Sequence, residues 1–220
     1  MLMPLLFVTW AEAQNKKFAE EMFQALHIHD TAKVIKSELA SLSALEKLVE
    51  KYPKEWLPGY WTAYIYTQVA RLDGRDPNFP KDLSYAEGIK RAQKYLEIAR
   101  QNAIQVSSKE KSDLTVMQGF IYSFLRKDRK YDSLMHLEYR KALQIDPTNV
   151  NLQVQSAINV ASKETATYAD VVASLAVFDY AASIFQKVEN RALTTYYTKD
   201  FIGFWRGRAM EKLTKLINQP

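Results

Sequence analysis

The stretch from Tyr85 to Ala103 carries its apolar residues on one helical stripe. A period of 3.6 residues places residues separated by steps of three and four on the same side of an α-helix, and that side must be buried against a neighbour. The segment therefore predicts an amphipathic helix with a single buried face. The stripe consists of Tyr85, Ile89, Ala92, Leu96, Ala99 and Ala103.

The same helical spacing recurs along the rest of the chain, and no segment shows the alternation of a half-buried strand. Glycine and proline are few, at six and seven residues, and several prolines separate the periodic segments. Asp30 is a good N-cap, and Ser107 with Glu110 forms a capping box. The sequence therefore predicts an all-α protein. The predicted helices cover residues 16–26, 30–52, 58–69, 85–103, 107–124, 131–145, 149–162, 167–191 and 203–217.

Charge is spread along the chain rather than gathered in one segment. Lysine and arginine outnumber aspartate and glutamate by 30 to 25, a net charge of +5, but acids regularly follow bases, as in Lys109-Glu110-Lys111. A nucleic-acid footprint needs its positive charge on one face, so no nucleic-acid partner is predicted. The absence of cysteine excludes disulfides, thiolate metal sites and cysteine nucleophiles.

The N-terminal segment is typical of an export signal. Residues 1–8 are almost wholly apolar, Ala11-Glu12-Ala13 has the small-x-small pattern of a signal-peptidase site, and polar residues follow from Gln14. We therefore expect a signal peptide over 1–13 and a periplasmic or secreted mature domain over 14–220. No lysine or arginine precedes the apolar run, so the alternatives are that the true start lies upstream or that the segment is a buried N-terminal strand or helix. A genuine, uncleaved start would make the protein cytoplasmic. No other stretch approaches the roughly 20 apolar residues of a membrane span.

Two stretches share a spacing of small and aromatic residues. The first has a Gly-x2-Tyr step and then a Tyr-x2-Ala-x4-Pro step, carried by Gly119, Tyr122, Tyr139, Ala142 and Pro147. The second has an Ala-x2-Tyr step and, after a loop over 73–80, an Ala-x3-Leu-x2-Ala step, carried by Ala63, Tyr66, Ala92, Leu96 and Ala99. This pattern resembles the tetratricopeptide repeat, a helix pair in which small residues let two helices approach and large ones fill the gaps.

The resemblance implies an α-α superhelix of about four stacked helix pairs, whose concave groove binds a segment of another protein. A third, weaker unit would begin at Asn149. The segments 51–63, 86–99 and 146–149 also look like a set of uncharacterised exported tetratricopeptide-like proteins of Bacteroidetes-type bacteria. Those proteins commonly end in a closing helix, for which Phe204-Trp205-Arg206-Gly207 is the counterpart here. The set carries no known reaction, so the resemblance implies a protein-protein interaction or scaffold module.

The resemblance also places aromatic residues in the groove. With Ala63 as the small packing position, Tyr60 and Tyr64 fall at groove positions, and tyrosines there favour peptide or glycan contacts. The alternative is that these rings fill the interface between helices. The Lys/Asn pair with which carboxylate-clamp domains hold acidic C-termini is missing. The predicted partner-binding set is Tyr60, Tyr64, Thr67, Gln68, Val116 and Phe120.

No pattern in the sequence predicts a metal, a cofactor or a reaction. His27 and His29 are two residues apart and would point to different sides of a helix, with no third ligand near them. The acids around Gly74 lack the closing glutamate of an EF-hand loop, so a capped turn is the better interpretation. No phosphate loop, nucleophile elbow or zinc-protease helix occurs. We therefore predict a protein that is not an enzyme.

Two other functions stay open beside the binding module. A glycan- or substrate-binding helical domain would use the aromatic cluster as its cleft. A structural subunit would self-associate through the C-terminal helix, because residues 201–205 are strongly apolar and a terminal repeat normally needs a polar outer face.

Overall fold

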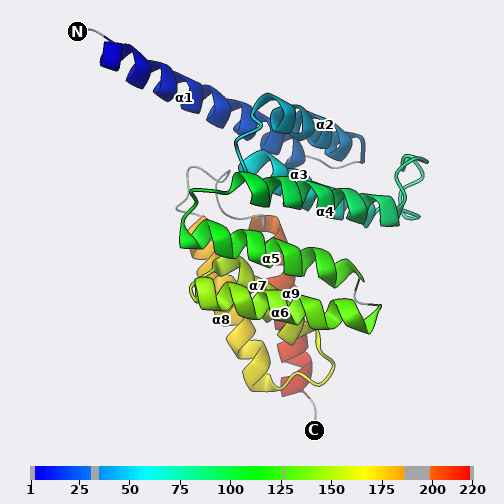
Figure 1. Cartoon of the computed structure of the whole chain (residues 1–220). Coiled ribbons are helices and arrows are strands. Elements are labelled where there is room, and N and C mark those ends of the chain that lie inside the picture. Colours follow the sequence, from blue (N-terminus) through cyan, green and yellow to red (C-terminus); the bar gives the residue numbers. More distant parts are fainter. Residues whose placement is uncertain (1–2, 31–34, 126, 186–198, 219–220) are drawn as a thin grey trace. The chain divides into compact units, whose positions relative to one another are not determined.

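The computed structural model describes residues 3–30, 35–125, 127–185 and 199–218 (Figure 1). Every regular secondary-structure element in these ranges is an α-helix, nine in all, with no strand among them. The prediction of an all-α protein is confirmed. The chain divides into two compact units, residues 1–105 and residues 106–220.

The first unit contains α1 (Met3–Asp30), α2 (Ile35–Lys51), α3 (Leu57–Ala70) and α4 (Tyr85–Asn102). Each of these helices packs on the next one along the chain. Every residue of α3 except Gln68 is buried. A helix that is apolar on all sides needs neighbours around its whole circumference, so α3 is the most buried helix of this unit.

Small residues bring α3 and α4 close together. A Cβ atom added at Gly59 would lie 2.9 Å from the Tyr95 carbonyl oxygen and 3.2 Å from the Ala99 Cβ. One added at Gly88 would lie 2.8 Å from the Ala70 Cβ. The start of each helix therefore lies against the end of the other, so the pair is antiparallel, and only glycine permits this close approach.

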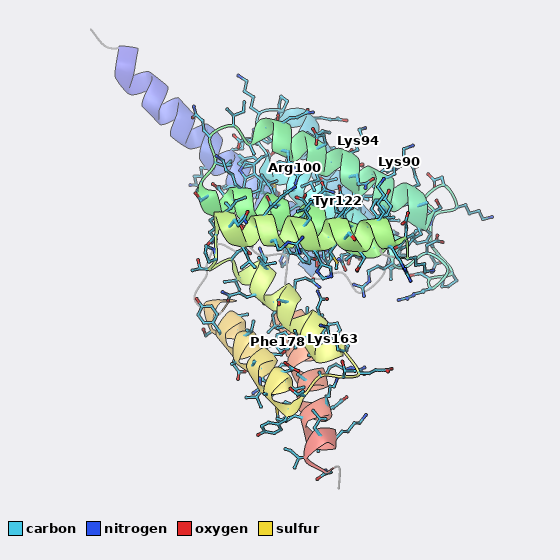
Figure 2. The ribbon with its side chains drawn as sticks, turned by 60° about the horizontal axis from the view of Figure 1, so that its bottom comes forward. Lys90, Lys94, Arg100, Tyr122, Lys163 and Phe178 are labelled. Carbon is cyan, nitrogen blue, oxygen red and sulfur yellow. The ribbon has the colours of Figure 1, made fainter. Side chains whose placement is uncertain are left out.

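The stripe predicted on α4 is confirmed. Its central members are buried, whereas Tyr85 and Ala103 at its two ends are half-buried. Lys90 and Lys94 project outward from the same helix (Figure 2). The helix is thus amphipathic, with one face packed on α3 and the other exposed. The buried members of the stripe are Ile89, Ala92, Leu96 and Ala99.

The second unit contains α5 (Ser108–Leu125), α6 (Arg129–Ile145), α7 (Val150–Ser162), α8 (Tyr168–Phe185) and α9 (Lys199–Ile217). Helix α5 packs on α6, and α8 packs on both α7 and α9. A Cβ atom added at Gly119 would lie 2.5 Å from Cε1 of Tyr139 and 3.3 Å from the Met135 carbonyl oxygen. The glycine and the aromatic ring that mark the first repeated stretch therefore contact each other across the α5–α6 pair.

Hydrogen bonds confirm two predicted helix starts. The Ser107 hydroxyl accepts from the Glu110 N–H at 3.3 Å, and the Glu110 carboxylate accepts from the Ser107 N–H at 2.7 Å, which completes the capping box of α5. At α7 the Asn149 side chain accepts from the Leu152 N–H at 3.0 Å. Each cap satisfies an N–H group that the helix itself leaves without an acceptor.

The prediction that Asp30 caps a second helix is wrong. Helix α1 continues through His27 and His29 and ends at Asp30, whereas α2 starts at Ile35. No glycine or proline interrupts α1 at the two histidines, so nothing in the backbone forces the predicted break.

The structure leaves two further predictions untested. The Ala11–Ala13 cleavage site falls within α1, and the export signal stays a prediction. Residues 186–191 of the predicted eighth helix lie outside the described residues. None of the helices in the described ranges is both long and apolar enough to cross a membrane.

Candidate functional site

The aromatic residues predicted for the groove lie inside the first unit. The Trp61 ring makes edge-to-face contacts with Tyr60 at 5.9 Å and with Tyr64 at 5.7 Å between ring centroids. Tyr64 also contacts the His29 ring of α1 at 5.8 Å. Tyr60 and Tyr64 are both buried. The first two contacts lie within α3, and the third joins α3 to α1, as expected of rings that fill the interface between helices.

The other predicted partner-binding residues are mostly buried as well. Thr67 is buried and donates a hydrogen bond to the Tyr64 carbonyl at 2.6 Å. Val116 and Phe120 are buried on α5. Gln68 is half-buried and accepts from Arg71 at 3.3 Å. Side chains without exposed area cannot contact a partner, so the burial favours the alternative in which these residues pack between helices.

The histidines of α1 make separate contacts. His29 Nδ1 lies 2.6 Å from a carboxylate oxygen of Glu38. His27 stacks on Phe23 with 6.0 Å between ring centroids. Within the described part of the chain, no group of three or more metal-ligating side chains comes together.

A carboxylate joins three helices of the first unit. Glu46 of α2 accepts hydrogen bonds from the hydroxyls of Tyr66 on α3, at 2.6 Å, and Tyr95 on α4, at 2.9 Å. The two rings stack, with centroids 5.6 Å apart. Arg91 donates to the Tyr66 hydroxyl at 3.4 Å and to Glu87 at 3.0 Å. The cluster crosslinks α2, α3 and α4 through polar side chains.

Burial and the neighbouring Glu46 carboxylate both favour the protonated form of the Tyr66 and Tyr95 side chains. Burial, followed by the hydrogen bond to Glu46, raises the pKa of Tyr66 to about 12. The same two causes raise the pKa of Tyr95 well above its usual value. Both phenols therefore remain hydrogen-bond donors at any physiological pH, which suits a structural crosslink and not proton transfer.

Two substitutions of Glu46 should separate what its hydrogen bonds contribute to stability from what its charge contributes. Glu46→Ala removes the shared acceptor of two phenol hydroxyls, and we expect a loss of about 1–3 kcal/mol in the free energy of unfolding. Glu46→Gln keeps a carbonyl acceptor and should cost less. Urea unfolding of both variants measures the difference, and equal losses would show that the hydrogen bonds contribute nothing.

A second polar cluster links α5 to the start of α7. Asp113 Oδ1 accepts from the side-chain amides of Asn149, at 2.8 Å, and Asn151, at 2.9 Å. Ser112 accepts from the Asn149 amide at 3.0 Å and donates to the Ala142 carbonyl at 3.0 Å. Asp113 is only 2% exposed, and its Oδ2 has no hydrogen-bond partner among the described residues.

The surroundings of Asp113 disfavour its charged form. Burial raises the pKa of this carboxyl to about 6, and the hydrogen bonds from Asn151 and Asn149 oppose that shift only in part. Lys109 lowers the pKa of Asp113 and Asp146 raises it, each by a smaller electrostatic effect. Asp113 therefore titrates in the mildly acidic range while it holds α5 to α7.

Helix α8 exposes an apolar row. Tyr168, Val172 and Tyr180 are between 41% and 55% exposed, and Ala176 between them is exposed as well. These four residues, which we name the α8 row, step by four and so form one ridge along the helix. The opposite side of α8 is buried and includes Phe178 (Figure 2).

Helix α9 exposes a second uncharged strip. The α9 stripe consists of Gly203, Gly207, Met210, Thr214 and Ile217, all exposed and separated by steps of four and three. Ile217 is 61% exposed, and Phe204 beside the stripe is 59% exposed.

Helix α9 is anchored to the unit by the side opposite its exposed one. Ile202 and Ala209 are buried. Lys212 donates hydrogen bonds to the carbonyls of Ala161 and of Lys163, the C-cap residue that follows α7 (Figure 2). A lysine at a helix C-terminus satisfies carbonyls that the helix leaves without a donor.

Exposed rows of apolar side chains are candidate interaction surfaces, so the α8 row and the α9 stripe form the candidate functional site. Sequence reasoning reached part of it, because the apolar segment 201–205 was expected at a self-association surface. In that segment Phe204 is exposed, Ile202 is buried and Trp205 is half-buried. The α8 row was missed, although its i+4 spacing is legible in the sequence.

Comparison of the chain with protein-family models, with curated proteins and with solved structures found no match.

Proposed function

We propose that this protein is an interaction module of the helical-repeat type, which binds a protein partner on the α8 row and the α9 stripe. The exposed apolar residues of α8 carry this proposal. From Tyr168 to Phe185 the helix has two charged residues, Asp170 and Asp179, and no basic residue. Asp179 already forms an ion pair with Arg206 at 2.6 Å.

The exposed residues are of the kind that contributes most to protein interfaces. Tyrosine, phenylalanine and methionine are enriched at the centres of interfaces, where they exclude water from a small set of contacts. The α8 row contributes two tyrosines, the α9 stripe contributes Met210, and Phe204 lies beside that stripe. Asp179 and Arg206 would form part of the polar rim of such an interface.

The proposal includes a tetratricopeptide-like superhelix as the architecture of the chain. Three features support it: the close α3–α4 and α5–α6 pairs, the contact of Gly119 with Tyr139, and the Asn149 cap after Pro147. In such an array each helix pair covers the apolar face of the one before it. An apolar face that remains exposed on the last pair is then a surface that a further partner can cover.

Photo-cross-linking tests the proposed function. A photo-reactive amino acid at Tyr180 should yield a protein adduct in cells that express the chain, because this position lies on the α8 row. Val172→Glu in the same chain should reduce the adduct at least tenfold, since it places a charge in an apolar contact.

The matched control carries the photo-reactive group at Leu143. This residue is exposed on α6 to a similar extent, at 46%, but lies outside the α8 row and the α9 stripe. Absence of a protein adduct at Tyr180, or an equal adduct at Leu143, would contradict the proposed surface.

A further inference from the structure

We infer that the contact between α5 and the start of α7 is a pH-sensitive joint, in which loss of the Asp113 proton releases the first turn of α7 from α5. The joint consists of Ser112 and Asp113 on α5 and of Asn149 and Asn151 at the start of α7. Neither the α8 row nor the α9 stripe contributes a residue to it, so it does not depend on the proposed function.

The closed joint provides hydrogen-bond donors for only one oxygen of the Asp113 carboxyl. Oδ1 accepts from both asparagine amides, whereas Oδ2 has no partner among the described residues, although Asp113 is only 2% exposed. A protonated carboxyl is neutral and tolerates this burial, but a carboxylate needs donors or water at both of its oxygens. The ionised form therefore favours an arrangement that admits water to Oδ2.

The charged groups around the joint do little to stabilise the Asp113 carboxylate. Burial is the largest influence and raises the pKa of Asp113 to about 6, while Lys109 of α5 lowers this pKa and Asp146 at the end of α6 raises it. Glu138 of α6 is already paired with Lys141 at 2.6 Å, and α7 carries no charged residue. The neutral and charged forms of the joint therefore interchange between mildly acidic and neutral pH.

The Asn149 side chain connects the carboxyl to the backbone of α7. Its nitrogen donates to Asp113 and to Ser112, and its oxygen accepts from the Leu152 N–H at 3.0 Å as the N-cap of the helix. Contacts at both ends of one short side chain fix a single orientation for it. A rearrangement at Asp113 therefore removes the acceptor of an N–H group that the helix itself cannot satisfy.

The packing of α7 allows its first turn to separate from α5. Helix α7 packs far more extensively on α8 than on α5 or α6. The polar joint is therefore a main attachment of α7 to the α5–α6 pair, and α7 can stay on α8 when the joint opens. Openings of this local kind occur in folded proteins without global unfolding.

Amide hydrogen exchange at Leu152 tests the joint in the wild-type chain at pH 5 and pH 7, with each rate divided by the intrinsic rate at that pH. The pKa of Asp113 is about 6 in the closed joint and should return to near its ordinary 3.8 in the open one. The open joint thus binds fewer protons, so rising pH favours opening, and protection at Leu152 should fall about tenfold over this range. Protection should also be lower at Leu152 than at the buried Ile121 of α5, because the opening is local.

The Asp170 amide provides the matched control in the same molecule. Its N–H donates to the Thr167 hydroxyl at 3.2 Å at the start of α8, which makes it a capped amide like that of Leu152. Backbone and side-chain hydrogen bonds from Thr167 lower the pKa of the Asp170 carboxyl, so this group stays charged and protection at Asp170 should not change. In Asp113→Asn, protection at Leu152 should be equal at the two pH values, because asparagine cannot ionise.

Three results would overturn the inference. The first is unchanged wild-type protection at Leu152, and the second is an equal fall at Asp170 or in Asp113→Asn. The third is equal protection at Leu152 and Ile121, which would mean that Leu152 exchanges only by global unfolding. If Asp113→Asn does not fold, the wild-type comparison of Leu152 with Asp170 and Ile121 decides by itself. Cross-linking at Tyr180 reports on the proposed function alone.

Discussion

Replacement of Asp113 by asparagine should abolish a step in stability between about pH 4 and pH 6. The Asp113 carboxyl loses its proton near 3.8 in the unfolded chain and near 6 in the folded one. Between these values the folded state binds more protons, so the free energy of unfolding falls as the pH rises. Below about pH 3 the carboxyl is neutral in both states and the folded chain avoids the cost of a buried charge.

The expected size follows from the difference between the two pKa values. Each pKa unit corresponds to about 1.4 kcal/mol, so the step amounts to about 3 kcal/mol, the largest effect that we predict. Asp113→Asn keeps an oxygen for the amides of Asn149 and Asn151 and cannot ionise. Its stability relative to wild type should therefore rise by about 3 kcal/mol from pH 3 to pH 7.

Urea unfolding of wild type and Asp113→Asn at a series of pH values measures this difference and cancels the titration of all other groups. Ser112→Ala is the control, because it removes two hydrogen bonds of the same cluster without removing an ionisable group. Its effect should be the same at every pH. Parallel curves of stability against pH for wild type and Asp113→Asn would refute the predicted cost of ionising the buried Asp113 carboxyl.

Gly59→Ala should destabilise the first unit by about 2 kcal/mol, because overpacking of a filled helix interface outweighs the helix preference of alanine. The added Cβ would lie 2.9 Å from the Tyr95 carbonyl oxygen and 3.2 Å from the Ala99 backbone nitrogen. These are backbone atoms of a neighbouring helix, so no rotation of a side chain can relieve the clash. The two helices must move apart, and the buried contacts of α3 with α4 weaken as they do.

Gly203→Ala is the matched control for this substitution. The chemical change is the same, but the added Cβ meets nothing within 4 Å. Alanine should therefore stabilise the chain by about 0.5–1 kcal/mol through its helix propensity. Thermal and urea unfolding of the two variants should give effects of opposite sign. A neutral or stabilising Gly59→Ala would show that the α3–α4 interface can relax.

Much of the fold was predictable because it depends on local physical chemistry. The α4 stripe follows from a 3.6-residue period, and the Ser107–Glu110 capping box and the Asn149 cap follow from side chains that reach N–H groups two or three residues away. The spacing of Gly119 and Tyr139 indicated a helix pair, and the two residues contact each other across that pair. Local patterns failed at Asp30, because a good capping residue does not start a helix where the preceding helix has no reason to end.

The candidate site depended on tertiary structure. Tyr60 and Tyr64 on α3 and the tyrosines of the α8 row are alike in the sequence, yet those on α3 are buried and those on α8 are exposed. The difference lies in the neighbours: α3 packs on α2 and, through two close glycine contacts, on α4, whereas the α8 row stays exposed in the described part of the chain.

The amino-acid sequence by itself determined that the chain forms helices, where most of them begin, and which residues are small enough for close pairs. These properties depend on the backbone and on residues within one or two turns. Only the tertiary structure decided which apolar residues become core and which become surface, and that Asp113 lies where its charge is costly. Burial depends on residues far apart in the chain, and a local pattern carries no record of them.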